Sequence, residues 1–549
     1  YSRQCKYLFS MSDVFNDLFS FYLSSLFFLL ISLNINQYVY SLSLDDGITK
    51  RTTDFYREAR TLRIQCGHEA TQALYEDLLR RNPWDKTAST YIAASSEAPL
   101  RQDTTCRSYD DIESIQQLRS LFDEHQYTNS KIQKVLNIPQ QLQYAKCPIY
   151  ITPLEAGTLK YPPVPQSGLE TLIALFLLGS TQPTHIVEDY LGPSVLSLWN
   201  KLGLAFVENS NVVVPYVHIF PIALTKRNLL IVTDLHPRIL NTIKVGSQHH
   251  GPIMYIGPDS LALIQHYSMH LSRDEEDEKQ SKIDIPLVDT VLDVCTGSGI
   301  QALSVENCKL ALCWDINPRA LNFVRFNAAL NDREEMCCCI LGDVITGDYR
   351  FLDPIPTAIK GTNDGILEGS IDLILANPPF IPVPEYQEDI SNRYGLFSSG
   401  GSDGESVIQA VMALASTLLR PGGVLAMVSE FANPNSITLR QRLQKWCPTS
   451  RGGILFTNER PLSAATYARR RADTDEEIAI WETHLSNCNI ESISPGLLWL
   501  QTKRHEDENV LLIKHDIVPH TNQGSIWTPS NENAVQYTQR AWETFIAGN

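Results

Sequence analysis

The chain has 549 residues, of which 43% are hydrophobic and 19% charged, and this composition excludes a chain that is disordered or collagen-like throughout. Its length predicts roughly three or four domains. The formal net charge is -17, which excludes general attraction to nucleic acid or anionic lipid and leaves only a local basic face for such contacts.

The first 44 residues differ from the rest because they contain an uncharged apolar run, Leu18–Leu33. Its length suits a signal-peptide core or a short anchor, and uncharged residues continue to Leu44, which would make a marginal membrane span. We expect residues 1–44 to be a leader that targets or anchors the protein, with a buried helix or an artefact of the gene sequence as alternatives. The expected location is cytoplasmic or organellar, with membrane contact only through residues 18–44.

Two regions precede the main motifs. Residues 45–150 carry helical patterns, such as Ile112–Phe122, and no motif that indicates chemistry. Within residues 151–270, three helical runs are followed by apolar strands, which predicts a winged-helix-like module. Its third helical run carries a single cation, Lys201, so we expect this module to bind a substrate or partner rather than nucleic acid. The charged residues at 271–285 then predict a solvated linker.

From Pro286 onward, short apolar runs alternate with amphipathic helical runs, which predicts an α/β fold with a parallel sheet and helices on both faces. We assign this domain to residues 286–520 and a C-terminal tail to 521–549. The predicted strands are residues 290–294, 310–315, 337–341, 371–376 and 424–429. The predicted helices are Gln301–Glu306, Pro318–Leu330 and Glu405–Leu419.

The strongest local signal is the segment 291–303, VLDVCTGSGIQAL, where a buried strand meets a glycine turn and then a helix. Gly297 and Gly299 permit a tight turn and close approach of a ligand to the backbone, while the helix start offers unpaired N–H groups. Asp315 follows Gly297 by 18 positions, where a ribose-binding carboxylate is expected. This spacing alone does not separate a nicotinamide cofactor from S-adenosylmethionine.

The ends of the other strands complete the pattern. Asp293 lies in the end of the first strand, Asp315 closes the second, Asp343 follows the third, and Asn377-Pro378-Pro379-Phe380 closes the fourth. On these residues, the segment from 286 to about 430 resembles the class I S-adenosylmethionine-dependent methyltransferases, and its NPPF tetrapeptide resembles that of enzymes that methylate a planar NH2 group. The resemblance implies a Rossmann-like domain with a mostly parallel seven-stranded sheet, and S-adenosyl-L-methionine as cofactor.

The same resemblance implies roles for individual residues. Asp293 and the Gly297–Gly299 turn would face the methionine part of the cofactor, Asp315 would hold the ribose hydroxyls, and Asp343 with Val344 would border the adenine. The remaining residues that it assigns to cofactor binding are Cys295, Thr296, Asn317 and Asn377.

The NPPF motif also has a physical rationale as a catalytic site. The lone pair of an amide or exocyclic amine is delocalised, so the nitrogen is a poor nucleophile. The Asn377 side-chain carbonyl and the Pro378 backbone carbonyl would accept both N–H bonds and favour a pyramidal nitrogen, while Phe380 would pack on the substrate plane. Pro378 and Pro379 would keep these acceptors fixed.

Two further segments narrow the resemblance to the release-factor glutamine methyltransferase family. They are residues 381–411, with a long loop and a Gly-rich turn, and Gly257-Pro258-Asp259-Ser260. Gly257 stands where that family usually has Arg, and Leu261 where it has Glu. The resemblance implies a protein glutamine substrate, and a translation release factor as a partner.

Several alternatives remain at this point. The NPPF motif and the preceding module also resemble ribosomal RNA guanine-N2 methyltransferases, so an enzyme for guanine N2 or adenine N6 of rRNA or tRNA is the first alternative, with RNA as partner. A NAD-dependent oxidoreductase is the second, and a non-catalytic binding protein the third. A basic stretch from Arg440 to Arg471 could contact phosphates, although a solvated face balanced by nearby acids is the simpler interpretation.

Cysteine and histidine clusters do not indicate a metal site. The 12 cysteines include no Cys-x-x-Cys pair. Cys337-Cys338-Cys339 lie in a predicted buried strand, where cysteine behaves as a small hydrophobic residue. His249, His250, His266 and His270 have no carboxylate at ligand spacing beside them. We therefore predict no metal.

Overall fold

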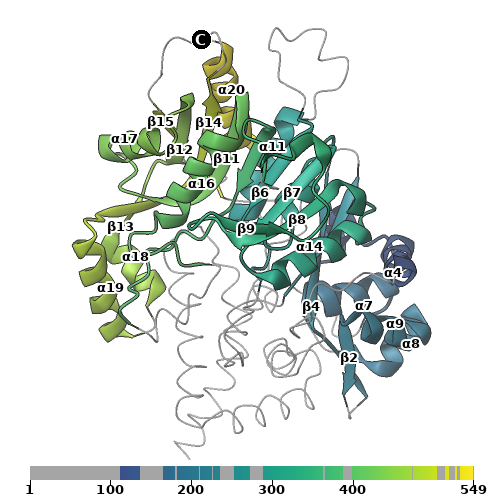
Figure 1. Ribbon diagram of the computed structural model, residues 1–549. Coiled ribbons are helices and arrows are strands. Elements are labelled where there is room, and N and C mark those ends of the chain that lie inside the picture. Colours follow the sequence, from purple (N-terminus) through teal and green to yellow (C-terminus); the bar gives the residue numbers. More distant parts are fainter. Residues whose placement is uncertain are drawn as a thin grey trace, which may run out of the picture.

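The computed structural model describes most of the chain from residue 112 onward (Figure 1). The predictions for residues 1–44, most of 45–150 and the linker at 272–285 lie outside the described residues. Within the described part of the chain, no helix is long and apolar enough to cross a membrane. The described residues are 112–136, 165–179, 182–208, 211–224, 227–234, 253–271, 288–362, 365–387, 398–472, 474–503, 513–518, 526–527 and 532–547.

The N-terminal part combines short helices with two small sheets. Helices α4 (Ile112–Glu124) and α5 (Asn129–Val135) are followed by α7 (Gly168–Leu172), which continues as a π-helical turn, η4 (Ile173–Leu177). Strand β1 (Gln182–Pro183), helices α8 (Thr184–Leu191) and α9 (Ser194–Leu202), and strands β2 (Ala205–Glu208) and β3 (Val212–Pro215) follow. Strands β1, β3 and β2 pair antiparallel in that order. This helix-strand-helix-helix-strand-strand order is the connectivity of a winged helix, and the limits of the module remain a proposal.

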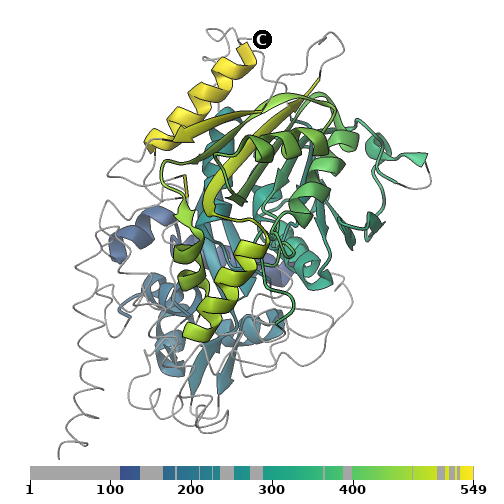
Figure 2. The ribbon, with the colours of Figure 1, turned by 90° about the vertical axis from the view of Figure 1, so that its left-hand side faces the viewer.

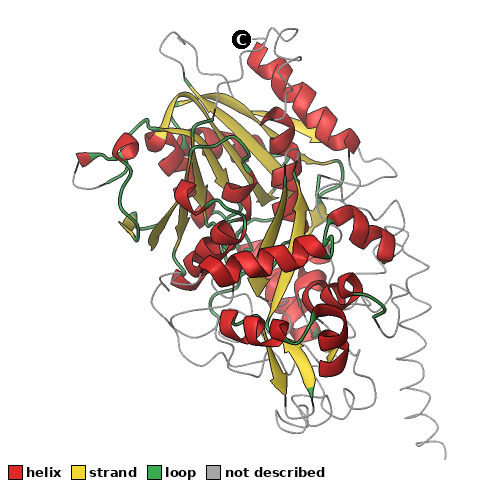
Figure 3. Cartoon of the chain, turned by 90° about the vertical axis from the view of Figure 1, so that its right-hand side faces the viewer, coloured by secondary structure: helices red, strands yellow, loops and turns green. Residues whose placement is uncertain are grey.

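A second hairpin leads from this module to the main sheet. Strands β4 (Val217–Ala223) and β5 (Asn228–Asp234) pair antiparallel and are almost entirely buried. Their apolar side chains belong to one cluster with Phe122 of α4, Phe176 and Trp199 of the module, and Phe323 of α14 (Pro318–Leu330). The hairpin thus packs between the N-terminal helices and the large domain (Figures 1 and 3).

The large domain is built on a ten-stranded sheet in the order β15-β12-β14-β11-β10-β6-β7-β8-β9, with β13 beside β14. The pairs between β8 and β11 are parallel, whereas β14 is antiparallel to both neighbours. The strands are β6 (Thr290–Val294), β7 (Leu310–Asp315), β8 (Cys337–Asp343), β9 (Asp348–Phe351), β10 (Ile371–Ala376), β11 (Leu419–Ala432), β12 (Ser450–Asn458), β13 (Leu462–Ser463), β14 (Ser492–Thr502) and β15 (Lys514–Val518).

This is a mixed α/β fold with a large, mostly parallel sheet, as the sequence predicts, and the sheet differs from the prediction in its extent. Seven strands, β12, β14, β11, β10, β6, β7 and β8, form the expected mostly parallel core, and β15, β9 and β13 extend it. The predicted strand at 424–429 is longer than expected, because pairing with β10 and β14 extends β11 to Leu419–Ala432. The predicted helices at Gln301–Glu306 and Glu405–Leu419 are slightly shorter.

Helices cover both faces of the sheet. On one face, α16 (Ser406–Leu418) and α17 (Ile437–Trp446) pack on Leu292 and Ile374. On the other, α11 (Pro258–Leu271), α13 (Ile300–Ser304) and α14 pack on Val291 and Leu373. Two short 3-10 turns follow: η5 (Glu334–Met336) lies between α14 and β8, and η6 (Thr357–Ile359) lies between β9 and β10. Successive side chains of β6 and β10 point to opposite faces, and both faces are covered by apolar helices. For this reason these strands are continuous apolar runs in the sequence.

Residues 521–549 are predicted to be a tail, but the helix described within them packs on the large domain. Helix α20 (Glu532–Ala547) packs on the sheet through Trp542, whose ring lies 5.2 Å from that of Trp499 in β14. Thr538 of α20 also contacts the His266 ring of α11, at 2.6 Å between Oγ1 and Nδ1. Figure 2 shows α20 in yellow along the edge of the sheet. Burial of its aromatic face against distant residues holds this segment in place.

An insertion between β12 and β14 forms a helical hairpin of α18 (Ala464–Arg471) and α19 (Asp475–Asn487). Its apolar side is a small separate cluster in which Tyr467 and Trp481 pack with Ile381 and Val383, just after the NPPF motif. The hairpin therefore lies next to the end of β10.

Candidate active site

A pocket of about 280 Å³ opens at the carboxyl ends of the central parallel strands β6, β7, β8 and β10. In an open α/β sheet, ligands bind in the crevice outside the carboxyl ends of the strands. Four segments of chain and the start of the NPPF motif line the pocket: residues 253–256, 294–298, 314–317, 342–345, Asn377 and Pro379.

The glycine turn after β6 forms the floor of the pocket. Cys295, Gly297 and Gly299 all have positive φ, at 59°, 55° and 81°. A side chain at Gly299 would place its Cβ 3.2 Å from a methyl group of Val324, so glycine is required there for helix α13 to approach α14. The Gly297 N–H donates to Asp315 Oδ2 at 2.9 Å, which ties the turn to the acid at the end of β7.

Asp293 lies beneath this turn rather than in the pocket. It is fully buried, and its Oδ2 accepts from Thr296 Oγ1 at 2.7 Å and from the Ala302 N–H at 3.0 Å. Its Oδ1 has no hydrogen-bond partner within the described residues. Burial raises the pKa of Asp293 to about 7, because removal from water disfavours the charged form. The carboxyl group thus shapes the turn from below.

The acids after β7 and β8 sit beside exposed apolar side chains. Asp315 accepts from the Asn317 N–H at 2.9 Å, and Asp343 accepts from the Ile345 N–H at 2.8 Å. Burial also raises the pKa of Asp315. Ile316 and Ile345 follow these acids and both line the pocket, yet they are 44% and 56% exposed. Apolar surface left open at such a site suits a flat, apolar ligand group.

The NPPF motif contributes only part of its length to the pocket. Asn377 and Pro379 line it, whereas Pro378 is buried. Phe380, expected on the substrate plane, turns away instead and lies 5.8 Å from the Trp527 ring. The Phe380 ring packs with the apolar cluster of the α18–α19 hairpin. This contact explains why the ring points away from the pocket.

The structure thus brings most of the predicted site residues together around one pocket. Nine of them line it: Cys295, Thr296, Gly297, Asp315, Asn317, Asp343, Val344, Asn377 and Pro379. Asp293, Gly299, Pro378 and Phe380 do not line it and support the site from behind.

Sequence reasoning missed several residues of the pocket. Ile316 and Ile345 belong to no motif in the sequence, although their places one and two residues after Asp315 and Asp343 were a usable signal. Ser260 also lines the pocket, and its backbone carbonyl accepts from Gln301 Nε2 at 3.1 Å. The family resemblance includes the turn that contains Ser260, but it assigns no role to the side chains of this turn.

The segment 253–256 is held in the pocket wall by a buried ion pair. Arg319, at the start of α14, pairs with both carboxylate oxygens of Asp234 at the end of β5, and both side chains are almost completely buried. Asp234 also accepts from the Ile253 N–H at 2.9 Å. The N-terminal hairpin is therefore connected directly to the wall of the pocket.

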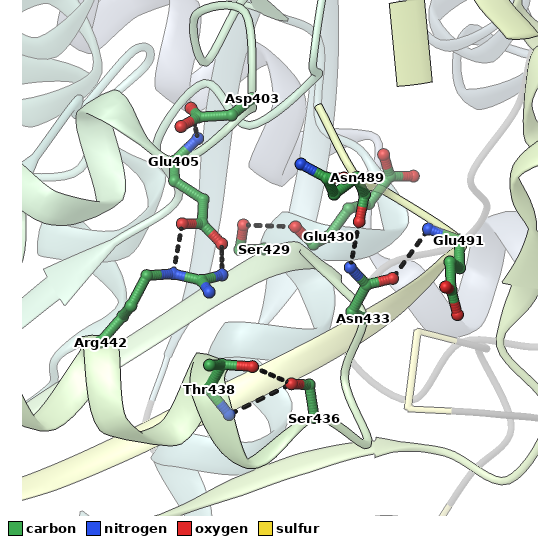
Figure 4. Close-up of polar contacts among 10 residues, drawn as sticks. All are labelled: Asp403, Glu405, Ser429, Glu430, Asn433, Ser436, Thr438, Arg442, Asn489 and Glu491. Carbon is green, nitrogen blue, oxygen red and sulfur yellow. Dashed lines mark hydrogen bonds and ion pairs between the residues drawn. The ribbon is translucent and has the colours of Figure 1, made fainter. Parts of the chain in front are cut away.

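A second polar region lies behind the pocket, around the end of β11 (Figure 4). Glu405 forms a bidentate pair with Arg442, at 3.0 Å to Nε and 2.6 Å to Nη2. Asn433 joins the end of β11 to the residues after α19, donating to the Asn489 carbonyl at 2.7 Å and accepting from the Glu491 N–H at 2.8 Å. A small cavity of about 10 Å³ lies beside this region and is lined by Glu405 and Glu430 among other residues.

Three arginines of the basic stretch from Arg440 to Arg471 are engaged within the protein, whereas Lys445, Arg460, Arg469 and Arg470 are exposed. Arg471 pairs with Glu430 at 2.8 Å, and Glu430 also accepts from Tyr467 Oη at 2.6 Å. Arg451 is buried and contacts Gln501. With Arg442 paired to Glu405, these three arginines do not present an open basic face.

Of the three consecutive cysteines in β8, Cys337 is half-buried and the other two are buried. Cys338 and Cys339 are almost inaccessible, and burial raises the pKa of Cys338 to about 12. Among the described residues, no group of His, Cys, Asp and Glu could hold a metal ion. His249 and His250 lie outside the described residues.

Comparisons with known proteins give one consistent result. No family model matches the chain. A curated release factor glutamine methyltransferase from Mycolicibacterium smegmatis is 31% identical over 150 residues, which cover 26% of this chain and 46% of that protein. The Mycobacterium tuberculosis protein of the same name is 33% identical over 155 residues, covering 26% and 44%. The chain spans about half the length of the curated relatives it matches, and the resemblance predicted from the sequence is confirmed.

Solved structures were compared as well. Geranyl diphosphate C-methyltransferase from Streptomyces coelicolor, in complex with S-adenosyl-L-homocysteine, is 12% identical, with a TM-score of 0.24 over 47% of this chain and 91% of that chain. The YcgJ protein from Bacillus subtilis is 13% identical, with a TM-score of 0.24 over 41% and 96%.

Proposed function

We propose that the protein is an S-adenosylmethionine-dependent methyltransferase that acts on the side-chain amide nitrogen of a protein glutamine. The observation that carries the proposal is the position of Asn377, which lines the pocket at the end of β10 beside a glycine turn and two acid-ended strands. The names of the curated relatives support the choice of acceptor, and a translation release factor is the proposed partner.

The residues of the pocket fit this cofactor. Asp315 can accept hydrogen bonds from ribose hydroxyls while it keeps its backbone contacts, since a carboxylate offers about four acceptor positions. Ile316 and Ile345 offer exposed apolar surface to an adenine ring between them. At Gly297 a Cβ would meet no atom within 4 Å, so the backbone of the turn is open to a ligand. When bound, S-adenosylmethionine supplies an activated methyl group on a sulfonium.

The protein's own task is then to position the acceptor. Asn377 Oδ1 and the Pro378 carbonyl would accept the two N–H groups of the acceptor amide and direct its nitrogen toward the glycine turn. Placing two groups in line accounts for a large part of a transfer rate without a covalent intermediate. Methylation would leave the nitrogen positively charged and acidic, and it would then release one of its protons to solvent.

The charges around the site favour a protein over a nucleic acid acceptor. Arg442 and Arg471 of the basic stretch are paired with Glu405 and Glu430, which makes these two cations less available to phosphates. The nucleobase alternative therefore becomes an outcome of the test below rather than a second proposal.

The test is methyl transfer from labelled S-adenosylmethionine to the proteins and RNA of a cell extract, with wild-type protein and Asn377→Ala. We expect protease, but not nuclease, to release the label. Asn377→Ala should lower the methyl-transfer rate by about 10²- to 10³-fold, as for removal of one positioned hydrogen-bonding group. Label released by nuclease would support the nucleobase alternative. A melting temperature raised by NADH and unchanged by S-adenosylhomocysteine would favour the oxidoreductase.

A further inference from the structure

The side-chain amide of Asn377 is held by two residues from the start of helix α11. Its Nδ2 donates to Asp259 Oδ2 at 2.9 Å and to Ser260 Oγ at 3.0 Å. An asparagine amide has two N–H bonds, so both are used. Within the described residues, its Oδ1 accepts no hydrogen bond from the protein and remains available on the pocket side.

Asp259 determines the orientation of the Asn377 side-chain amide. With the amide turned over, Oδ1 would meet a carboxylate oxygen, and two acceptors in contact repel each other. The Ser260 hydroxyl does not discriminate, because it can accept or donate. The choice between the nitrogen and oxygen positions of an amide follows from its hydrogen-bond partners, and here the carboxylate fixes the nitrogen toward α11.

The two partners are themselves held firmly. Asp259 is only 3% exposed, and Ser260 is tied to α13 through its carbonyl and Gln301. A Cβ at position 257 would lie 2.2 Å from Asp259 Oδ1. Gly257 therefore leaves the space that the Asp259 carboxylate occupies, at the position where the resembling family usually has arginine.

We propose that Asp259 and Ser260 are positioning residues that fix the Asn377 amide with Oδ1 turned toward the acceptor nitrogen. The proposal rests on the proposed function, because it assigns these residues a part in aligning the acceptor. Both residues would act through Asn377, and Ser260 also lines the pocket.

The first test compares Asp259→Asn, Ser260→Ala and Asn377→Ala in the full-length protein. The amide introduced at position 259 can face either orientation of Asn377, so Asp259→Asn is expected to lower kcat by about 10- to 100-fold, as for misplacement of a reacting group. The KM for S-adenosylmethionine should change by less than about twofold, since only transition-state alignment is lost. Ser260→Ala should lower kcat less than Asp259→Asn.

The double variant separates positioning from a structural role. Because Asp259 acts through Asn377, Asp259→Asn should cause no further loss in the Asn377→Ala background. Asp475→Asn is the matched control, since Asp475 is an exposed acid in the first turn of α19, and it should leave kcat unchanged. Wild-type kcat in Asp259→Asn, or an equal loss in both backgrounds, would overturn the proposal.

The second test does not depend on activity. With asparagine side chains labelled by 15N, the Asn377 amide signal is assigned by its disappearance in Asn377→Ala. Both of its protons should exchange slowly with solvent in the wild type and at least one much faster in Asp259→Asn. Slow exchange in a protein that transfers no methyl group would refute the proposed function alone. Fast exchange in the wild type would refute the positioning role, whether or not methyl transfer occurs.

Discussion

Asn327 of helix α14 hydrogen-bonds to both backbone groups of Val232 in strand β5. Its Oδ1 accepts from the Val232 N–H at 2.8 Å, and its Nδ2 donates to the Val232 carbonyl at 2.9 Å and to the Ser298 carbonyl at 2.8 Å. One helical turn later, Asn331 makes the same pair of contacts with Leu230, at 2.8 and 2.9 Å. The helix therefore takes the place of a neighbouring strand along the edge of the β4–β5 hairpin.

This relationship predicts a large effect of Asn327 on stability. Asn327→Leu should lower the free energy of unfolding by about 2–5 kcal/mol, since it leaves buried backbone groups of Val232 and Ser298 unpaired at roughly 1–3 kcal/mol each. Urea denaturation followed by tryptophan fluorescence measures the change. Asn487→Ala, at an exposed position in α19, is the control and should change stability by less than about 0.5 kcal/mol. Equal stability of both variants would contradict the prediction.

Asp293 predicts a dependence of stability on pH. Its pKa is raised to about 7 by burial, whereas in the unfolded chain it should be about 3.9. Between these values the folded protein keeps a proton that the unfolded chain has lost. The free energy of unfolding should therefore fall as the pH rises, by at most about 1.4 kcal/mol per pH unit, and the fall should end above the folded pKa.

The comparison of wild type with Asp293→Asn isolates this contribution, because other titrating groups such as His218 and His266 are the same in both. The variant should show a flatter dependence of the free energy of unfolding between pH 5.5 and pH 7, roughly the interval below the folded pKa. Parallel curves for the two proteins would show that Asp293 does not keep its proton in the folded state.

Substitution of Ile345 should weaken ligand binding without affecting folding. Ile345→Ser removes apolar surface from the pocket wall, and it should weaken S-adenosylhomocysteine about 5- to 10-fold, corresponding to roughly 1–1.4 kcal/mol. Stability should hardly change, because the side chain is already 56% exposed. Calorimetric titration measures the affinity, with Ile437→Ser as control, since Ile437 is 60% exposed and lies outside the pocket lining. Equal affinities of the two variants would argue against Ile345 in the site.

The central strands could be predicted from the sequence because the residues that mark them as buried are adjacent in the chain. Residues 290–294, 310–315 and 371–376 form strands with those bounds, since each is an apolar run that ends at a polar or turn-forming residue. Strand β9 was missed because Asp348–Phe351 is short and half-exposed and depends on pairing with β8. Helix α20 was missed because its apolar face has its partners in β14 and α11, far away in the sequence.

The candidate site, too, could be predicted from the sequence only in part. The acids and glycines at strand ends could be placed together from the sequence, because carboxyl ends of parallel strands meet at one edge. The contact between Asp259 and Asn377 could not, since 118 residues separate them and neither belongs to a periodic pattern. The direction of Phe380 was likewise set by a helical hairpin whose position no local signal reveals.

The contacts of Asn327 and Asn331 also bear on how the chain folds during synthesis. They join residues 95 and 101 positions apart, so the β4–β5 hairpin leaves the ribosome well before the helix that satisfies its outer edge. Until α14 has been made, that strand exposes unpaired backbone groups beside a mostly apolar surface, which is the kind of edge that associates with other chains. The nascent N-terminal module should therefore need chaperone protection over this interval, and truncated chains that end before Pro318 should aggregate.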